Sequence, residues 1–184
     1  SASKVKGAGK VSLTGNVTEV KITVTASSGE KKTYTISVAK QNTSTETISS
    51  KVYKIGSTIT GVNFDTSVKD FKKNISVPSG YTIKIVDKNG KEMTSGNVGT
   101  GTKVVMYKGN SSVKNYAIVI KGDANGDSKV TSVDSLMIKR HIIGTYNLSG
   151  DYKDGADVNG DGKLTSVDSL MIKKHIIGTY TIKN

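Results

Sequence analysis

The segment "DANGDSKVTSVD" spans residues 123–134, and "DVNGDGKLTSVD" spans residues 157–168 further along the chain. Each dodecamer is followed by "SLMIK" and then by His-Ile-Ile-Gly-Thr-Tyr. Over 24 aligned positions, residues 123–146 and 157–180 are identical at 20. Two copies are too few to build a solenoid, so the repeat indicates a pair of equivalent units with internal symmetry.

Each dodecamer carries Asp, Asn and Asp at loop positions one, three and five, and a further Asp at position twelve. Such side chains converge on one centre in a tightly curled loop, and the carbonyl of position seven adds another oxygen. Oxygen donors without His or Cys suit Ca²⁺ far better than zinc or copper, so we predict two calcium ions. The predicted ligands are Asp123, Asn125, Asp127, the Lys129 carbonyl and Asp134 in the first loop, and Asp157, Asn159, Asp161, the Lys163 carbonyl and Asp168 in the second.

A helix cap in an Asx-rich turn is the alternative interpretation of this pattern. Two copies in register, each followed by an amphipathic stretch, favour the metal loop. Position twelve is Asp where an EF-hand has Glu, so each loop must close more tightly. Position six is Ser128 in the first loop and Gly162 in the second. We therefore expect the first turn to be more strained and the first site to be weaker.

With both loops and both helical stretches, residues 122–184 resemble a type I dockerin, the duplicated module that binds cohesins in cellulosomes and related bacterial assemblies. The resemblance implies a small all-α module with two F-hand calcium loops, packed antiparallel and folded only with calcium. A segment of about sixty residues with few large apolar groups has little core, so metal-coupled folding is physically reasonable.

A helix over residues 132–143 would be apolar on two sides, one more than a small core requires. One side, with Met137, Ile138, His141 and Ile142, is opposite a side with Ser132, Leu136, Lys139 and Ile143. We expect one side to pack on the twin helix and the other to meet a partner.

The dockerin resemblance implies that cohesin is contacted by loop positions ten and eleven and by the basic pair further along each helix. The predicted partner-binding residues are Ser132, Val133, Leu136, Lys139, Arg140, Ser166, Val167, Leu170, Lys173 and Lys174. Val133 and Val167 stand where many cellulosomal dockerins have a second hydroxyl, which leaves the choice of cohesin open. The near identity of the two surfaces suggests two binding orientations related by a half turn.

The rest of the chain is predicted to be β-rich, so the fold class is multidomain: Ig/cadherin-like sandwich modules followed by the dockerin. Residues 1–45 alternate as a hairpin, with a third strand near 11–13, and resemble a partial cadherin-like β-sandwich. Residues 46–121 are predicted to form an X-module-like sandwich. Its strands fall in "SKVYKIG", "TIKIVDKNG", "TKVVMYKGN" and "KNYAIVIKG", and "TSVKDFKKNI" has helical spacing.

The composition limits the function classes. The sequence has no Cys, which excludes a disulfide framework, a thiolate zinc site and a Cys nucleophile. The net charge is +12, but the lysines are scattered without stacking aromatic residues, so we expect no nucleic-acid partner. A solvated surface explains this charge best, and contact with an anionic cell wall is the alternative. No apolar run is long enough for membrane insertion.

No catalytic constellation stands out, and His141 and His175 have the spacing of packed helix residues, so we expect no enzyme activity. We expect the C-terminal piece of a larger exported bacterial protein, extracellular or on the cell surface. Its predicted partner is a cohesin of a scaffoldin or surface protein. The alternative is a structural role, in which the calcium-loaded dockerin packs on the preceding β-module and stiffens the C-terminus.

Overall fold

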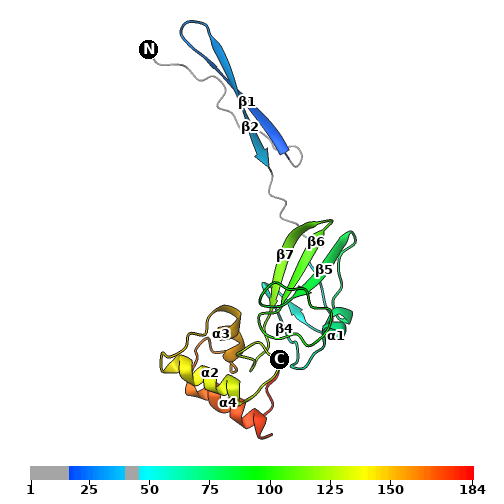
Figure 1. Cartoon of the computed structure of the whole chain (residues 1–184), viewed down its shortest axis with the longest axis vertical. Helices are drawn as coiled ribbons and strands as arrows, with labels where there is room; N and C mark the ends of the chain where they lie inside the picture. The colour runs from blue at the N-terminus through cyan, green and yellow to red at the C-terminus, as the bar shows by residue number, and fades with distance from the viewer. Residues whose placement is uncertain (1–16, 40–45) are drawn as a thin grey trace. The chain divides into compact units, whose positions relative to one another are not determined.

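The computed structural model describes residues 17–39 and 46–184 (Figure 1). The chain divides into two compact units, Ser1–Thr43 and Ser44–Asn184. Within the second unit, we call residues 46–121 the sheet segment and residues 122–184 the helical segment. The sequence predicted these segments to be separate domains, and that division stays a prediction.

The first unit contains an antiparallel hairpin. Strands β1 (Val17–Thr25) and β2 (Lys31–Ala39) pair with Ile22 opposite Tyr34, and Gly29 adopts a positive φ of 88° in the turn. The predicted hairpin is therefore confirmed. Tyr34 and Ile36 are exposed, so among the described residues nothing covers this side of the pair. The third strand predicted near 11–13 lies outside the described residues, and the described part shows no sandwich here.

The sheet segment forms one mixed sheet of five strands. These are β3 (Lys54–Ile55), β4 (Thr58–Thr60), β5 (Tyr81–Val86), β6 (Lys103–Lys108) and β7 (Ser111–Ile118), in the order β3-β4-β7-β6-β5. Strand β4 pairs in parallel with β7, and the other pairs are antiparallel. Each of the four predicted segments contains a strand. The predicted sandwich is not seen, because the described residues of this segment form a single sheet.

A short helix replaces the second layer of a sandwich. Helix α1 (Val68–Lys73) begins after Ser67, whose Oγ accepts the N–H of Asp70. Its apolar side is buried, and the Phe71 ring stacks on Tyr53 with centroids 5.1 Å apart. The predicted helix is confirmed. Its side chains share one core with buried residues of the sheet, including Ile59, Ile85, Val104, Met106, Tyr116 and Ile118.

The helical segment contains α2 (Ser132–Ile142), α3 (Gly150–Ala156) and α4 (Ser166–Ile176). Helices α2 and α4 lie side by side (Figure 1). Buried Ile138 and Ile172 belong to their shared core, and the hydroxyls of Ser135 and Ser169 are 2.8 Å apart. The two helices of the repeat therefore meet through equivalent residues. Helix α3, which is short, was not predicted.

Candidate calcium loops and partner-binding face

The first Asp of each loop organises the backbone in the same way. Asp123 Oδ1 accepts the N–H groups of Gly126 at 2.7 Å and Asp127 at 3.1 Å, and its Oδ2 accepts that of Ser128 at 3.1 Å. In the second loop, the carboxylate of Asp157 accepts the three equivalent amides at 2.9–3.2 Å. Both dodecamers therefore curl around their first carboxylate.

The carboxylate at position twelve joins the two ends of each loop. Asp134 Oδ1 accepts the N–H of Ala124 at 2.9 Å, and its Oδ2 accepts the N–H of Thr131 at 2.8 Å. The Thr131 hydroxyl caps α2, and the same arrangement recurs with Thr165 and Asp168 at α4. The helix cap considered as an alternative is thus present, and it uses a predicted calcium ligand.

Positions three and five are exposed or partly exposed and bond to each other. Asn125 donates from Nδ2 to Asp127 Oδ2 at 2.9 Å, and Asn159 donates to Asp161 in the same way. Lys129 gives its N–H to the Asp127 carboxylate at 2.9 Å, and Lys163 matches it in the second loop at 2.8 Å. Over residues 17–39 and 46–184, no three His, Cys, Asp or Glu side chains are gathered closely enough to hold one ion.

The electrostatics of the first loop favour a cation. Asp123 and Asp134 are both 0% exposed, and neither has an ion pair among the described residues. Burial raises the pKa of Asp123 to about 6, and the nearby Asp134 carboxylate adds to this shift. Burial also raises the pKa of Asp134, with a smaller contribution from Asp127. Fully buried carboxylates are normally paired, so the residues present fit a bound divalent cation in charge and in donor chemistry.

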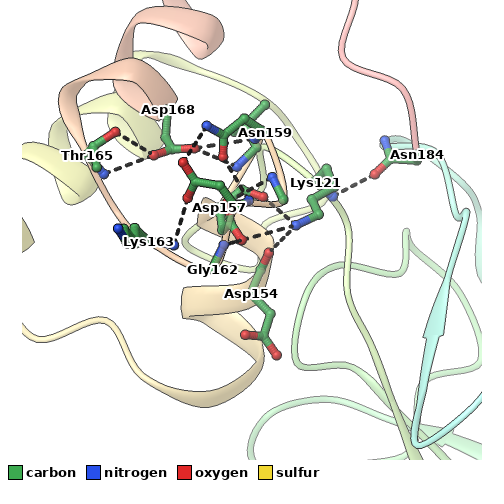
Figure 2. A network of polar contacts seen from close by, with 12 residues as sticks. Lys121, Asp154, Asp157, Asn159, Gly162, Lys163, Thr165, Asp168 and Asn184 are labelled. Carbon is green, nitrogen blue, oxygen red and sulfur yellow. Dashed lines mark hydrogen bonds and ion pairs between the residues drawn. The ribbon is translucent and has the colours of Figure 1, made fainter.

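The second loop has a lysine beside it, which sequence reasoning missed (Figure 2). Lys121 Nζ donates to the carbonyls of Asp154, at 3.0 Å, and Asp157. The same ammonium lies 3.9 Å from Asp157 Oδ2. The backbone N–H of Lys121 donates to Asn184 Oδ1 at 2.6 Å. One residue therefore connects the end of α3, the first carboxylate of the second loop and residue 184.

The first loop contacts the sheet segment directly. Asp123 Oδ2 accepts the N–H of Thr100 at 2.9 Å, in a buried position. The carbonyl of Ser128 accepts the N–H of Asp65 at 2.8 Å. At the other end of the helical segment, the His175 ring meets Phe64 edge-on, with centroids 5.2 Å apart. The two segments of the second unit are therefore joined by polar and aromatic contacts.

The two histidines have structural partners. His141 Nδ1 accepts the N–H of Leu148 at 3.1 Å, and His175 Nδ1 accepts that of Ile182 at 3.4 Å. Leu148 and Ile182 are buried in the core of the helical segment. Each imidazole therefore holds the chain that follows its helix, which agrees with the packing role expected from the sequence.

All ten predicted partner-binding residues are exposed. Val133 and Leu136 are 50% and 53% exposed on α2, and Val167 and Leu170 are both 49% exposed on α4. We call the surface formed by these ten residues the twin-helix face. Ile142, the last residue of α2, is also exposed, although it lies on the side of the helix opposite Leu136.

The basic residues of the two helices meet on the twin-helix face. Lys173 lies beside Lys139 and lowers the pKa of that residue, first because the Lys173 side chain can hydrogen-bond a neutral Lys139 amine and second because the two positive charges repel. Arg140 follows Lys139 on α2, and its guanidinium lies 5.8 Å from the ring centroid of Tyr146. The contact between Lys139 and Lys173 shows that the face is continuous across both helices.

One comparison with known proteins found a match. The family model of the dockerin type I domain matches residues 121–177. This match supports the dockerin predicted at the C-terminus, a non-catalytic module that binds calcium and cohesin. The searches of curated proteins and of solved structures found no match. No helix in the described part of the chain is long and apolar enough to cross a membrane.

Proposed function

We propose that the helical segment binds a cohesin through the twin-helix face and so attaches a larger exported protein to a multi-protein assembly. The observation that carries this proposal is the equal exposure of equivalent residues on α2 and α4. The core of the helical segment does not include Val133, Leu136, Val167 and Leu170. Their exposure therefore contributes little to folding and is typical of a surface that binds a partner. Apolar side chains flanked by four cations favour a partner surface with an apolar centre and acidic groups around it.

The calcium ligands are proposed to be those of the sequence pattern: Asp123, Asn125, Asp127, the Lys129 carbonyl and Asp134, with Asp157, Asn159, Asp161, the Lys163 carbonyl and Asp168 in the second loop. Bound calcium would supply the positive charge that the buried carboxylates lack. The chain itself fixes the first and last ligands through loop amides. Because Asp134 and Asp168 also cap α2 and α4, an ordered loop holds the start of each recognition helix.

Two orientations on one cohesin follow from the same geometry. Ser135 and Ser169 face each other across the helix contact, each donating to the other's backbone carbonyl or hydroxyl. A half turn about this contact would exchange α2 with α4 and bring Val167 to the place of Val133. The exchanged surfaces differ at Arg140, which is Lys174 in the second copy.

A structural clamp within the chain is the second candidate. It is favoured by the buried bond from Thr100 to Asp123 and by the contact between Asp65 and Ser128. These contacts use the first loop, whereas the twin-helix face stays exposed. The two functions are therefore compatible, and a clamp alone gives no reason for the exposed apolar pairs.

The test is a calorimetric titration against a panel of type I cohesins, in excess calcium and again in chelator. We expect calcium-dependent binding to at least one member. Val133→Asp and Val167→Asp should each leave binding largely intact, because the other helix can serve, and the double variant should lose it. Val52→Asp is a matched control, since Val52 is an exposed valine of the sheet segment.

The outcomes separate the candidates. Loss of binding in one single variant would refute the two orientations but not the cohesin partner. If calcium bound and raised the thermal stability, but no cohesin bound, the clamp would become the better explanation.

A further inference from the structure

The two calcium loops are almost identical in sequence but have different surroundings. A Cβ on Gly160 or Gly162 of the second loop would meet nothing within 4 Å. A Cβ on Gly126, the equivalent of Gly160, would collide with the carbonyl of Thr100 and lie 3.0 Å from the Tyr152 ring. The first loop is thus packed closely against the sheet segment, whereas this part of the second loop faces open space.

The sheet segment donates a hydrogen bond to the central carboxylate of the first loop. Asp123 Oδ2 accepts the Thr100 N–H at 2.9 Å, in addition to the loop's own Ser128 N–H. Thr100 is itself held in place, because its Oγ1 accepts the N–H of Ile120 at 3.1 Å. The donor is therefore held within the sheet segment by a contact that does not involve the loop. In the described part of the chain, no backbone amide of the sheet segment donates to the Asp157 carboxylate, whose neighbour from that segment is the Lys121 ammonium at 3.9 Å.

Strained backbone lies at the second contact. Asp65 and Ser128 have φ values of 59° and 69°, and they are the two non-glycine residues with positive φ in the described part of the chain. The N–H of Asp65 donates to the Ser128 carbonyl at 2.8 Å and approaches the Ser128 Oγ at 3.1 Å. Strain of this kind persists where surrounding contacts hold it. A glycine at position 128, such as the second loop has at Gly162, would relieve the strain but would lose the Ser128 hydroxyl.

We propose that the sheet segment is part of the first calcium site, with Thr100 and Asp65 as positioning residues. The Thr100 amide aims the Asp123 carboxylate, and the Asp65–Ser128 contact fixes the turn at position six. Calcium binding at the first loop is then coupled to docking of residues 99–101, and the coupling acts equally in both directions. The second loop binds independently of these residues. This inference rests on the calcium binding proposed above.

Gly99→Ala tests the coupling without touching a predicted ligand. The added Cβ would lie 2.6 Å from the Gly126 carbonyl oxygen and 2.9 Å from the Ser128 nitrogen, so the first loop must move away. Gly56→Ala is the matched control, because its Cβ would meet only the Thr58 carbonyl, at 3.7 Å. Calcium titrations followed by NMR should use the amides of Gly126 and Gly160 to report the two loops separately.

Gly99→Ala should weaken calcium binding at the first loop by about 10- to 100-fold, the usual effect of losing a partner that orients a ligand. The second loop, and both loops of Gly56→Ala, should change by less than about twofold. Equal affinities in Gly99→Ala and the unchanged chain would overturn the coupling. A loss at both loops would indicate general destabilisation and would also count against it.

A second measurement uses the unchanged chain, in case Gly99→Ala does not fold. The Thr100 amide should shift during the calcium titration with the same midpoint as Gly126. A Thr100 amide that stays constant while Gly126 shifts would overturn the coupling and leave calcium binding intact. If neither Gly126 nor Gly160 responds to calcium, the proposed calcium function itself fails.

Discussion

Effects on stability and on binding should separate when a buried isoleucine of α2 is compared with the exposed isoleucine that follows this helix. Ile138 is 0% exposed in the contact between α2 and α4, whereas Ile143, just beyond α2, is 70% exposed. Ile138→Ala removes about three buried carbon groups, or about 2.4 kcal/mol of transfer free energy at roughly 0.8 kcal/mol each. The remaining cavity should bring the total loss to about 3–4 kcal/mol. Ile143→Ala should change the free energy of unfolding by less than about 0.5 kcal/mol.

Thermal and urea unfolding in excess calcium measure the loss of stability, and cohesin titration measures the loss of binding affinity. For a unit of this size, Ile138→Ala should lower Tm by roughly 6–15 °C. Ile143→Ala should leave Tm unchanged, and the double variant Ile143→Ala with Ile177→Ala, which alters both helices, should lose several-fold in cohesin affinity. Ile172→Ala and Ile177→Ala provide the same comparison at α4, where the exposures are 0% and 71%. The reasoning is refuted if Ile138→Ala costs less than about 1 kcal/mol, or if Ile143→Ala destabilises the protein as much as Ile138→Ala.

Two further predictions concern charge. In chelator, stability should fall by up to about 3 kcal/mol as pH rises from 3.8 to about 6, because the folded state binds the Asp123 proton more tightly than the unfolded state. Urea unfolding across this range should show the fall, and a flat profile would contradict it. Lys121→Met should lower stability by about 2 kcal/mol, since two carbonyls lose a charged donor. It should also tighten calcium binding at the second loop a few-fold in calorimetry, because a cation 3.9 Å from the Asp157 carboxylate is removed. Weaker binding would instead show that Lys121 positions Asp157.

Local patterns could be predicted from the sequence. The curl of each loop around Asp123 or Asp157 depends on residues within the same dodecamer, and the helices begin at Thr caps beside them. The hairpin in the first unit and helix α1 also have periodic apolar residues that a short window reveals. In these places the sequence neighbourhood contains the partners that decide the structure.

Contacts between distant residues could not be predicted. Nothing in the sequence links Thr100 to Asp123 or Lys121 to Asp157, because a backbone amide carries no sequence signal and a lysine is rarely diagnostic. Strand β4 has only three residues, which is too short to show the alternation of apolar and polar residues that predicts a strand. Its parallel pairing with β7 also joins residues far apart in the sequence. The predicted sandwich became one sheet because α1 and the connecting chain fill its core.

The seam between α2 and α4 constrains how the two copies of the repeat can diverge. Ser135 meets its own counterpart, Ser169, so a mutation in one copy faces an unchanged residue and must be matched in the other. Ser128 does not contact its counterpart, because its neighbour is Asp65, and the two copies differ at this position, with Gly162 in the second loop. The repeat thus contains paired positions that must evolve together and solitary positions that can specialise. Protein engineers who want two unequal binding surfaces should edit the solitary ones.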